Sequence, residues 1–288
     1  MSNPGIGVSD EFADLAALRA GLDAFAAAVS LREPIASVTD EVVRRPDRDI
    51  PLRVYRPAAA DDAVLVWFHG GGYIAGSLAA IDPVCRALAR RLGSTVVSVG
   101  YRLAPEHPFP AALDDALEAV TSVAAWPGAS RVAIGGDSAG GGLAAAVARL
   151  TEVPLRAQVL LCPFLDATLS CPSVLQNGEG NLLTATALRQ FVHLYLGAHG
   201  EAADPRVSPL LGTDFSGLPP AVVVTAGNDP LRDEGELYAA RVAAAGAATF
   251  VRRWDGMVHG FVGMTAELDQ AQAALDWATS QLRLLLDT

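Results

Sequence analysis

Short apolar runs recur along the chain and predict buried strands. The run at residues 63–68, Ala-Val-Leu-Val-Trp-Phe, is apolar throughout, which is typical of a strand covered on both faces of a sheet. Five further runs predict strands at residues 95–99, 131–135, 157–162, 221–225 and 249–254. Two extended stretches, at residues 37–44 and 50–56, flank a turn signal and predict an antiparallel pair at one edge of the sheet.

Segments of helical periodicity lie between these strands. They predict helices at about residues 10–30, 78–92, 111–125, 143–150, 184–196, 233–245 and 266–286. Eight strands that alternate with helices predict an α/β fold, with a mostly parallel, doubly wound sheet and helices on both of its faces. Ligands of such sheets bind beyond the carboxyl ends of the strands.

One connection is much longer than the others. Nearly sixty residues separate the strand that ends at Cys162 from the strand that begins at Ala221, and a single crossover helix needs far fewer. The helix predicted at 184–196 shares one apolar face among Leu188, Phe191, Val192 and Tyr195. Because long insertions usually serve a function, we expect this one to cover the active site. The alternative is a decorated crossover that does not contact substrate.

The first predicted helix is amphipathic. It places these apolar side chains at helical spacing: Phe12, Leu15, Leu18, Leu22 and Phe25. Such a helix lies on another surface, either as ordinary core packing or over a binding pocket.

Composition restricts the class of protein. Half of the 288 residues are apolar, which suffices for one large domain. No apolar run approaches the ~18 residues of a membrane span, and the amino terminus is acidic, unlike a secretory signal. We therefore expect a cytoplasmic protein that does not bind membranes. Its net charge of −11, with no lysine, makes nucleic acid a poor partner.

Three cysteines are present, and their spacing matches no metal site: Cys85, Cys162 and Cys171. We expect free, mostly buried thiols. A disulfide between Cys162 and Cys171 is the alternative, which a reducing cytoplasm disfavours.

The sequence Gly136-Asp137-Ser138-Ala139-Gly140 joins a predicted strand to a predicted helix. This is the context of a nucleophile elbow, a tight and strained turn that leaves a serine hydroxyl exposed above the sheet. The flanking glycines remove side chains that would collide where strand and helix meet. Ser138 is therefore the candidate nucleophile.

A glycine run follows another strand end. In His69-Gly70-Gly71-Gly72 the bare backbone can turn several N–H groups toward one point, where they would stabilise an oxyanion. The N–H of Ala139, at the start of the next helix, would be a further donor. A phosphate-binding loop is the alternative, but the run fits neither known glycine pattern and the chain has no lysine.

A serine nucleophile needs a base and an acid. Five histidines compete for the first role: His69, His107, His193, His199 and His259. Only His259 lies between the last strand and the last helix, where the order Ser, Asp/Glu, His requires the base. Asp229 follows a strand end and precedes Pro230, which favours it as the acid over Asp233, at the start of a helix.

The motifs together resemble the hormone-sensitive-lipase-like esterases of the α/β-hydrolase superfamily, in particular bacterial members with a Gly-Asp-Ser-Ala-Gly elbow. The resemblance covers residue 40 to the end and rests on five motifs in order: His69 to Gly72, Tyr101 to Ala111, Gly136 to Gly140, Asp229 to Asp233, and His259 to Phe261.

This resemblance implies carboxylic ester hydrolysis by Ser138, His259 and Asp229, with Gly71, Gly72 and Ala139 as oxyanion donors and no cofactor or metal. It also implies a cap at residues 1–40 and 166–207 over a catalytic domain at 41–165 and 208–288, and dimers are frequent in the family, which suggests a homodimer.

The expected substrate is a small ester with a short to medium acyl chain in an apolar, partly covered pocket. We expect four side chains to line it: Tyr73, Leu188, Phe191 and Tyr195. An amidase or acyl transferase could use the same triad, and a non-catalytic receptor could use the same scaffold. The presence of all three triad residues argues against the receptor.

Overall fold

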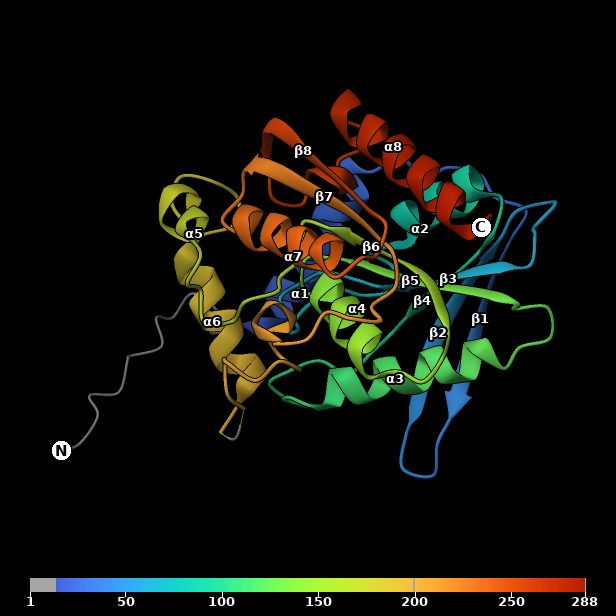
Figure 1. The fold of residues 1–288 in the computed structure, drawn as a ribbon, viewed down its shortest axis with the longest axis horizontal. Coiled ribbons are helices and arrows are strands. Elements are labelled where there is room, and N and C mark those ends of the chain that lie inside the picture. Colours follow the sequence, from blue (N-terminus) through green and yellow to red (C-terminus); the bar gives the residue numbers. More distant parts are fainter. Residues whose placement is uncertain (1–13, 199, 288) are drawn as a thin grey trace.

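The computed structural model describes residues 14–198 and 200–287 (Figure 1). Its centre is one eight-stranded sheet with the order β1-β2-β4-β3-β5-β6-β7-β8. The strands are β1 (Ser37–Arg44), β2 (Asp49–Arg56), β3 (Ala63–Phe68), β4 (Thr95–Val99), β5 (Arg131–Asp137), β6 (Leu155–Leu161), β7 (Ala221–Asn228) and β8 (Thr249–Val258). Strands β3 to β8 run parallel, and β2 pairs antiparallel with β1 and β4. The predicted fold class is confirmed.

Helices cover both faces of the sheet. They are α1 (Leu15–Val29), α2 (Asp82–Leu92), α3 (Ala111–Ala124), α4 (Ala139–Leu150), α5 (Pro172–Asn177), α6 (Ala185–Leu196), α7 (Arg232–Ala244) and α8 (Asp269–Leu286), with short 3₁₀ turns η2 (Pro209–Leu211) and η3 (Phe261–Gly263). Helices α3, α4 and α7 share one hydrophobic core with the sheet, and α2 and α8 share the other (Figure 1). The core therefore has the two layers expected of a doubly wound sheet.

The carboxyl ends of the parallel strands meet at one edge, where α1, α5 and α6 also gather (Figure 1). Helix α1 is the amino-terminal helix predicted from periodicity, although Phe12 lies outside the described residues. Helix α6 lies in the long insertion and begins at an N-cap, where the Thr184 side chain accepts a hydrogen bond from the Ala187 N–H.

Some boundaries differ from the prediction. Helix α2 begins at Asp82 rather than near residue 78, because Pro83 fits only the first turn of a helix. Strand β7 continues to Asn228 and β8 to Val258, and the two pair across an irregularity after Ala226. The short helix α5 was not predicted. No helix in the described ranges has the length and apolar character needed to span a membrane; the cytoplasmic location stays a prediction.

Candidate active site

Ser138 occupies the turn between β5 and α4 and has a strained backbone, with φ 54° and ψ −121°. A residue with a side chain adopts this region only when its surroundings impose it. The surroundings here are tight: a β-carbon on Gly136 would collide with the Gly140 backbone, and one on Gly140 with the Phe68 carbonyl. The two glycines therefore let β3, β5 and α4 approach closely enough to form the turn.

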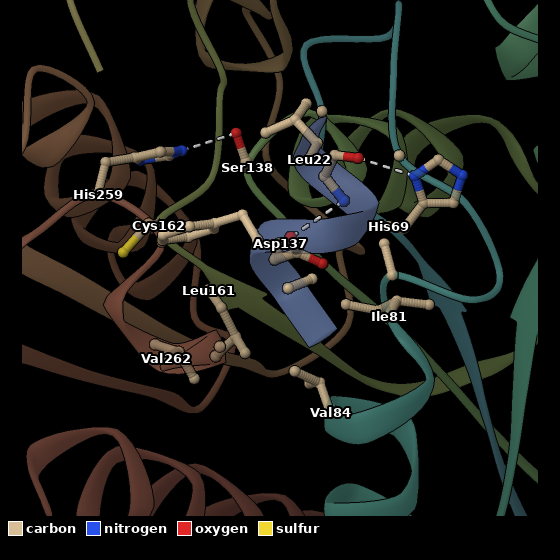
Figure 2. Close-up of a pocket in the computed structure, with 18 of the residues that line it drawn as sticks. Leu22, His69, Ile81, Val84, Asp137, Ser138, Leu161, Cys162, His259 and Val262 are labelled. Atoms are coloured by element: carbon tan, nitrogen blue, oxygen red, sulfur yellow. Dashed lines mark hydrogen bonds between the residues drawn. The ribbon is translucent and has the colours of Figure 1, made fainter. Parts of the chain in front are cut away.

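The structure joins the three predicted residues in one chain of hydrogen bonds. His259 Nε2 lies 2.9 Å from Ser138 Oγ (Figure 2), and His259 Nδ1 lies 2.8 Å from Asp229 Oδ2. His259 comes from the loop between β8 and η3, and Asp229 directly follows β7. The carboxyl ends of parallel strands in one sheet thus bring together residues that are far apart in sequence.

Asp229 is fully buried, and its second carboxylate oxygen accepts the Leu231 N–H at 2.8 Å. This bond fixes the carboxylate so that Oδ2 faces the imidazole. Asp233 points elsewhere, since its Oδ2 accepts the Ser173 N–H at the start of α5. Asp255, a further carboxylate near His259 in sequence, is exposed on β8.

The other described histidines have different surroundings. His69 stacks on Tyr101, with ring centroids 4.3 Å apart, and burial lowers its pKa to about 4. It is therefore neutral and structural, as the glycine-loop interpretation requires. His107 and His193 are exposed, and His199 lies outside the described residues.

The surroundings of His259 raise the pKa of its imidazole. Burial lowers the pKa of the imidazole, but the charge of Asp229, its hydrogen bond and the charge of Asp137 together outweigh burial, so the pKa is raised. Burial raises the pKa of Asp137 to about 6, so this carboxylate is ionised above that pH.

The glycine loop holds its N–H groups open. Gly71 and Gly72 have φ of 119° and 63°, the left-handed region that favours glycine. Within the described ranges, neither N–H donates a hydrogen bond. Ala139 is the first residue of α4, so its N–H has no acceptor within the helix. The role of these three N–H groups as oxyanion donors stays a prediction.

Sequence reasoning gave no role to Asp137, yet it ties the loop to the elbow. Its carboxylate accepts the Gly70 N–H at 3.0 Å and the Trp67 indole N–H at 3.2 Å. Its place directly before the nucleophile was the available signal.

An apolar cavity of about 410 Å³ opens beside Ser138 and His259 (Figure 2). Helix α1 contributes Leu22 and Phe25 to its wall, and the insertion contributes Leu182 and Phe191. The body of the domain adds a further apolar wall: Ile81, Val84, Leu161, Cys162 and Val262.

Of the four predicted pocket residues, only Phe191 lines this cavity. Tyr73 and Tyr195 stack on each other with centroids 3.8 Å apart, and Leu188 is buried in the same core. The prediction was wrong for these three because the apolar face of α6 is used mainly to attach the helix to the domain, and Tyr73 is the domain residue on which Tyr195 packs.

All three cysteines are free and buried, which confirms that prediction and excludes the Cys162–Cys171 disulfide. The spacing of the cysteines along the chain did not, however, predict one cluster of possible metal ligands. Cys162 Sγ and ligand atoms of Asp229 and His259 all lie within 4.8 Å of one another.

The chain matches known proteins over most of its length. The sequence profile of the alpha/beta hydrolase fold matches residues 65–263. The chain is 41% identical over 278 residues to the carboxylic ester hydrolase LipN of Mycobacterium tuberculosis, with 90% of this chain and 73% of that protein covered. It is 39% identical over 246 residues to an ethyl acetate hydrolase of Pseudomonas putida, covering 80% of this chain and 77% of that protein.

Solved structures are similar to this chain as well. The thermophilic carboxylesterase EstE1, cloned from a metagenomic library, superposes with a TM-score of 0.90 at 40% identity, over 95% of this chain and 98% of that chain.

Proposed function

The chain belongs to the hormone-sensitive-lipase-like carboxylesterases of the alpha/beta hydrolase fold, and we propose that it hydrolyses small carboxylic esters through Ser138, His259 and Asp229. One observation carries this proposal: the hydrogen-bonded chain from Ser138 Oγ through His259 to Asp229, at the wall of an apolar cavity.

Each residue has a distinct role. Ser138 Oγ attacks the ester carbonyl carbon while His259 Nε2 accepts its proton. Asp229 holds the imidazole with its N–H on Nδ1, so that Nε2 is free to accept, and stabilises the imidazolium that forms. The N–H groups of Gly71, Gly72 and Ala139 stabilise the negative charge on the carbonyl oxygen.

The tetrahedral intermediate then collapses. The C–O bond to the alcohol breaks, and His259 returns the proton to the leaving oxygen, which gives the alcohol and an acyl-Ser138 ester. Water repeats the sequence: His259 accepts a proton from water as its oxygen attacks, and the acid leaves with Ser138 restored. The protein's own side chains supply every proton transfer, so no cofactor enters these steps.

Two segments form a cap over this chemistry: the described part of residues 1–36, since residues 37–40 of the predicted cap belong to β1, and the described part of residues 166–207. Phe25 of α1 and Phe191 of α6 support this division because both line the cavity. The stacking of Tyr195 on Tyr73 anchors α6 to the catalytic domain. We expect the cap to keep this position during turnover. The homodimer stays a prediction.

The cavity volume predicts a preference for short to medium acyl chains. Each added methylene gains about 0.8 kcal/mol only while it can be buried, so kcat/KM should rise over the first carbons and fall beyond about eight. Initial rates on a series of p-nitrophenyl acyl esters measure this profile.

The same kind of assay distinguishes ester hydrolysis from the alternative amidase and acyl transferase activities. Matched acyl anilides test amidase activity, and added alcohols test acyl transfer. A steady rise through long-chain triacylglycerols, with a jump when substrate passes its solubility limit, would contradict the fixed cap.

The rate should also depend on pH through His259. Only the neutral imidazole accepts the Ser138 proton, so kcat/KM should increase as pH rises through a pKa above the ordinary imidazole value of about 6.5. Rates on one soluble ester across the neutral range measure the midpoint.

Asp137→Asn provides the control for that midpoint. It removes a negative charge that raises the pKa of His259, so the midpoint should move to lower pH. A flat profile from about pH 5 to 8 would count against His259 as the base.

A further inference from the structure

Cys162 lies beside the proposed triad, although nothing in the hydrolysis mechanism uses it (Figure 2). It directly follows β6, as Asp229 follows β7 and His259 follows β8, so three successive strand ends bring a thiol, a carboxylate and an imidazole together. Their ligand atoms lie within 4.8 Å of one another. Sulfur, nitrogen and oxygen from Cys, His and Asp form a ligand set typical of zinc.

The backbone fixes the thiol in this place. Cys162 has φ 46°, in the left-handed region, and its N–H donates to the Val224 carbonyl at 2.8 Å. A residue with a side chain is held there only by its surroundings. Cys162 and His259 both line the cavity, whereas Asp229 is fully buried and does not, so a cation would enter by way of the first two residues.

We propose that Cys162, Asp229 and His259 form a binding site for a thiophilic divalent cation such as Zn²⁺ or Cd²⁺, and that the bound cation reversibly inhibits the enzyme. The inhibitory effect rests on the proposed triad; the binding site itself does not.

The ligand atoms must move to build the site, since they lie within 4.8 Å of one another and tetrahedral zinc holds a sulfur roughly 3.6 Å from a nitrogen or oxygen ligand. Tetrahedral zinc with bonds of about 2.0–2.2 Å to nitrogen and oxygen separates those atoms by roughly 3.3 Å. The Nδ1 to Oδ2 distance is 2.8 Å, so it must open by about half an ångström. The carboxylates of Asp229 and Asp137 favour a cation here, since both interact with the thiol and the imidazole.

The proton balance explains the inhibition. Burial and the charge of Asp229 raise the pKa of the Cys162 thiol, so the metal must displace the thiol proton, which leaves to solvent. The metal also takes the lone pair of His259 Nδ1, and the proton of that nitrogen moves to Nε2. Nε2 then carries a hydrogen toward Ser138 Oγ and cannot accept one.

Enzyme freed of metal by a chelator tests the inhibition. Zn²⁺ should lower the rate of short-chain ester hydrolysis by wild type at least about tenfold, and EDTA should restore it. Cys162→Ala and Cys162→Ser, each compared with its own metal-free rate, should need on the order of 100-fold more Zn²⁺. Cys171→Ala is the matched control, a buried free thiol beside other carboxylates, and should respond like wild type.

Cd²⁺ titration gives a readout that does not require activity. Wild type and Cys171→Ala should show one equivalent of thiolate-to-metal absorption in the near ultraviolet. Cys162→Ala should lose the absorption, and His259→Gln should weaken the binding.

Three results would overturn the proposal. They are active wild-type enzyme that Zn²⁺ does not inhibit, inhibition of Cys162→Ala at the same Zn²⁺ concentration as wild type, and Cd²⁺ absorption that survives in Cys162→Ala. Should metal-free wild type not hydrolyse esters, the proposed function fails, and the Cd²⁺ titration alone decides whether the site exists.

Discussion

Replacing Ser138 by alanine should lower kcat for ester hydrolysis by about 10⁶, because the variant lacks the atom that forms the acyl-enzyme. The loss should come without unfolding. Alanine keeps the β-carbon and therefore the same backbone strain, and among the described residues the hydroxyl makes one side-chain hydrogen bond, to His259. Steady-state rates and thermal unfolding of the two proteins measure both effects.

Covalent labelling distinguishes loss of the nucleophile from general damage. An alkyl phosphonate ester should add its mass to wild type and not to Ser138→Ala. Ser216→Ala, at an exposed position away from the cavity, should be labelled and should hydrolyse esters like wild type. Burst-phase acylation in a folded Ser138→Ala protein would show that another residue is the nucleophile.

Asp229→Asn should lower kcat about 10⁴-fold, because the imidazole of His259 would then adopt the wrong tautomer. The structure indicates how the amide will orient. Its oxygen should keep the Leu231 N–H, which Asp229 Oδ1 accepts at 2.8 Å. The NH₂ group then takes the place of Oδ2 and donates to His259 Nδ1, which moves the ring proton to Nε2. Nε2 can no longer accept the proton of Ser138.

Asp233→Asn is the matched control, four residues further along the chain. Its carboxylate pairs with Arg232 and accepts the Ser173 N–H, and neither contact reaches the triad. We expect a loss of about 1 kcal/mol in the free energy of unfolding and nearly wild-type kcat. Denaturant unfolding and ester turnover test both. If the two variants exchanged their effects, Asp233 would be the acid.

The hydrophobic pattern determined the architecture. Apolar runs at β3, β5 and β7 indicated buried strands, and the helical segments between them required parallel connections. Parallel strands place their carboxyl ends at one edge, so residues that follow separate strands were expected to meet. Ser138, Asp229 and His259 could therefore be selected together without knowing a single distance.

Tertiary structure decided which surface each apolar face covers. Periodicity placed Phe191 and Tyr195 on one face of α6, yet Phe191 lines the cavity and Tyr195 stacks on Tyr73. Hydrophobic burial has no direction, so a sequence pattern shows that a side chain is buried but not against what. The lengths of β7 and β8 likewise depended on their mutual pairing.

Electrostatics and side-chain chemistry at the site also required the three-dimensional arrangement. Nothing in the spacing of Cys162 relates it to Asp229 and His259, which follow two other strands. The pKa of His259 depends on the balance between its burial and two nearby carboxylates. The cluster and the pKa both depend on short distances between residues that are far apart in sequence. The chain order alone identified the reacting groups, and only the packing of strand ends brought the thiol and the second carboxylate beside them.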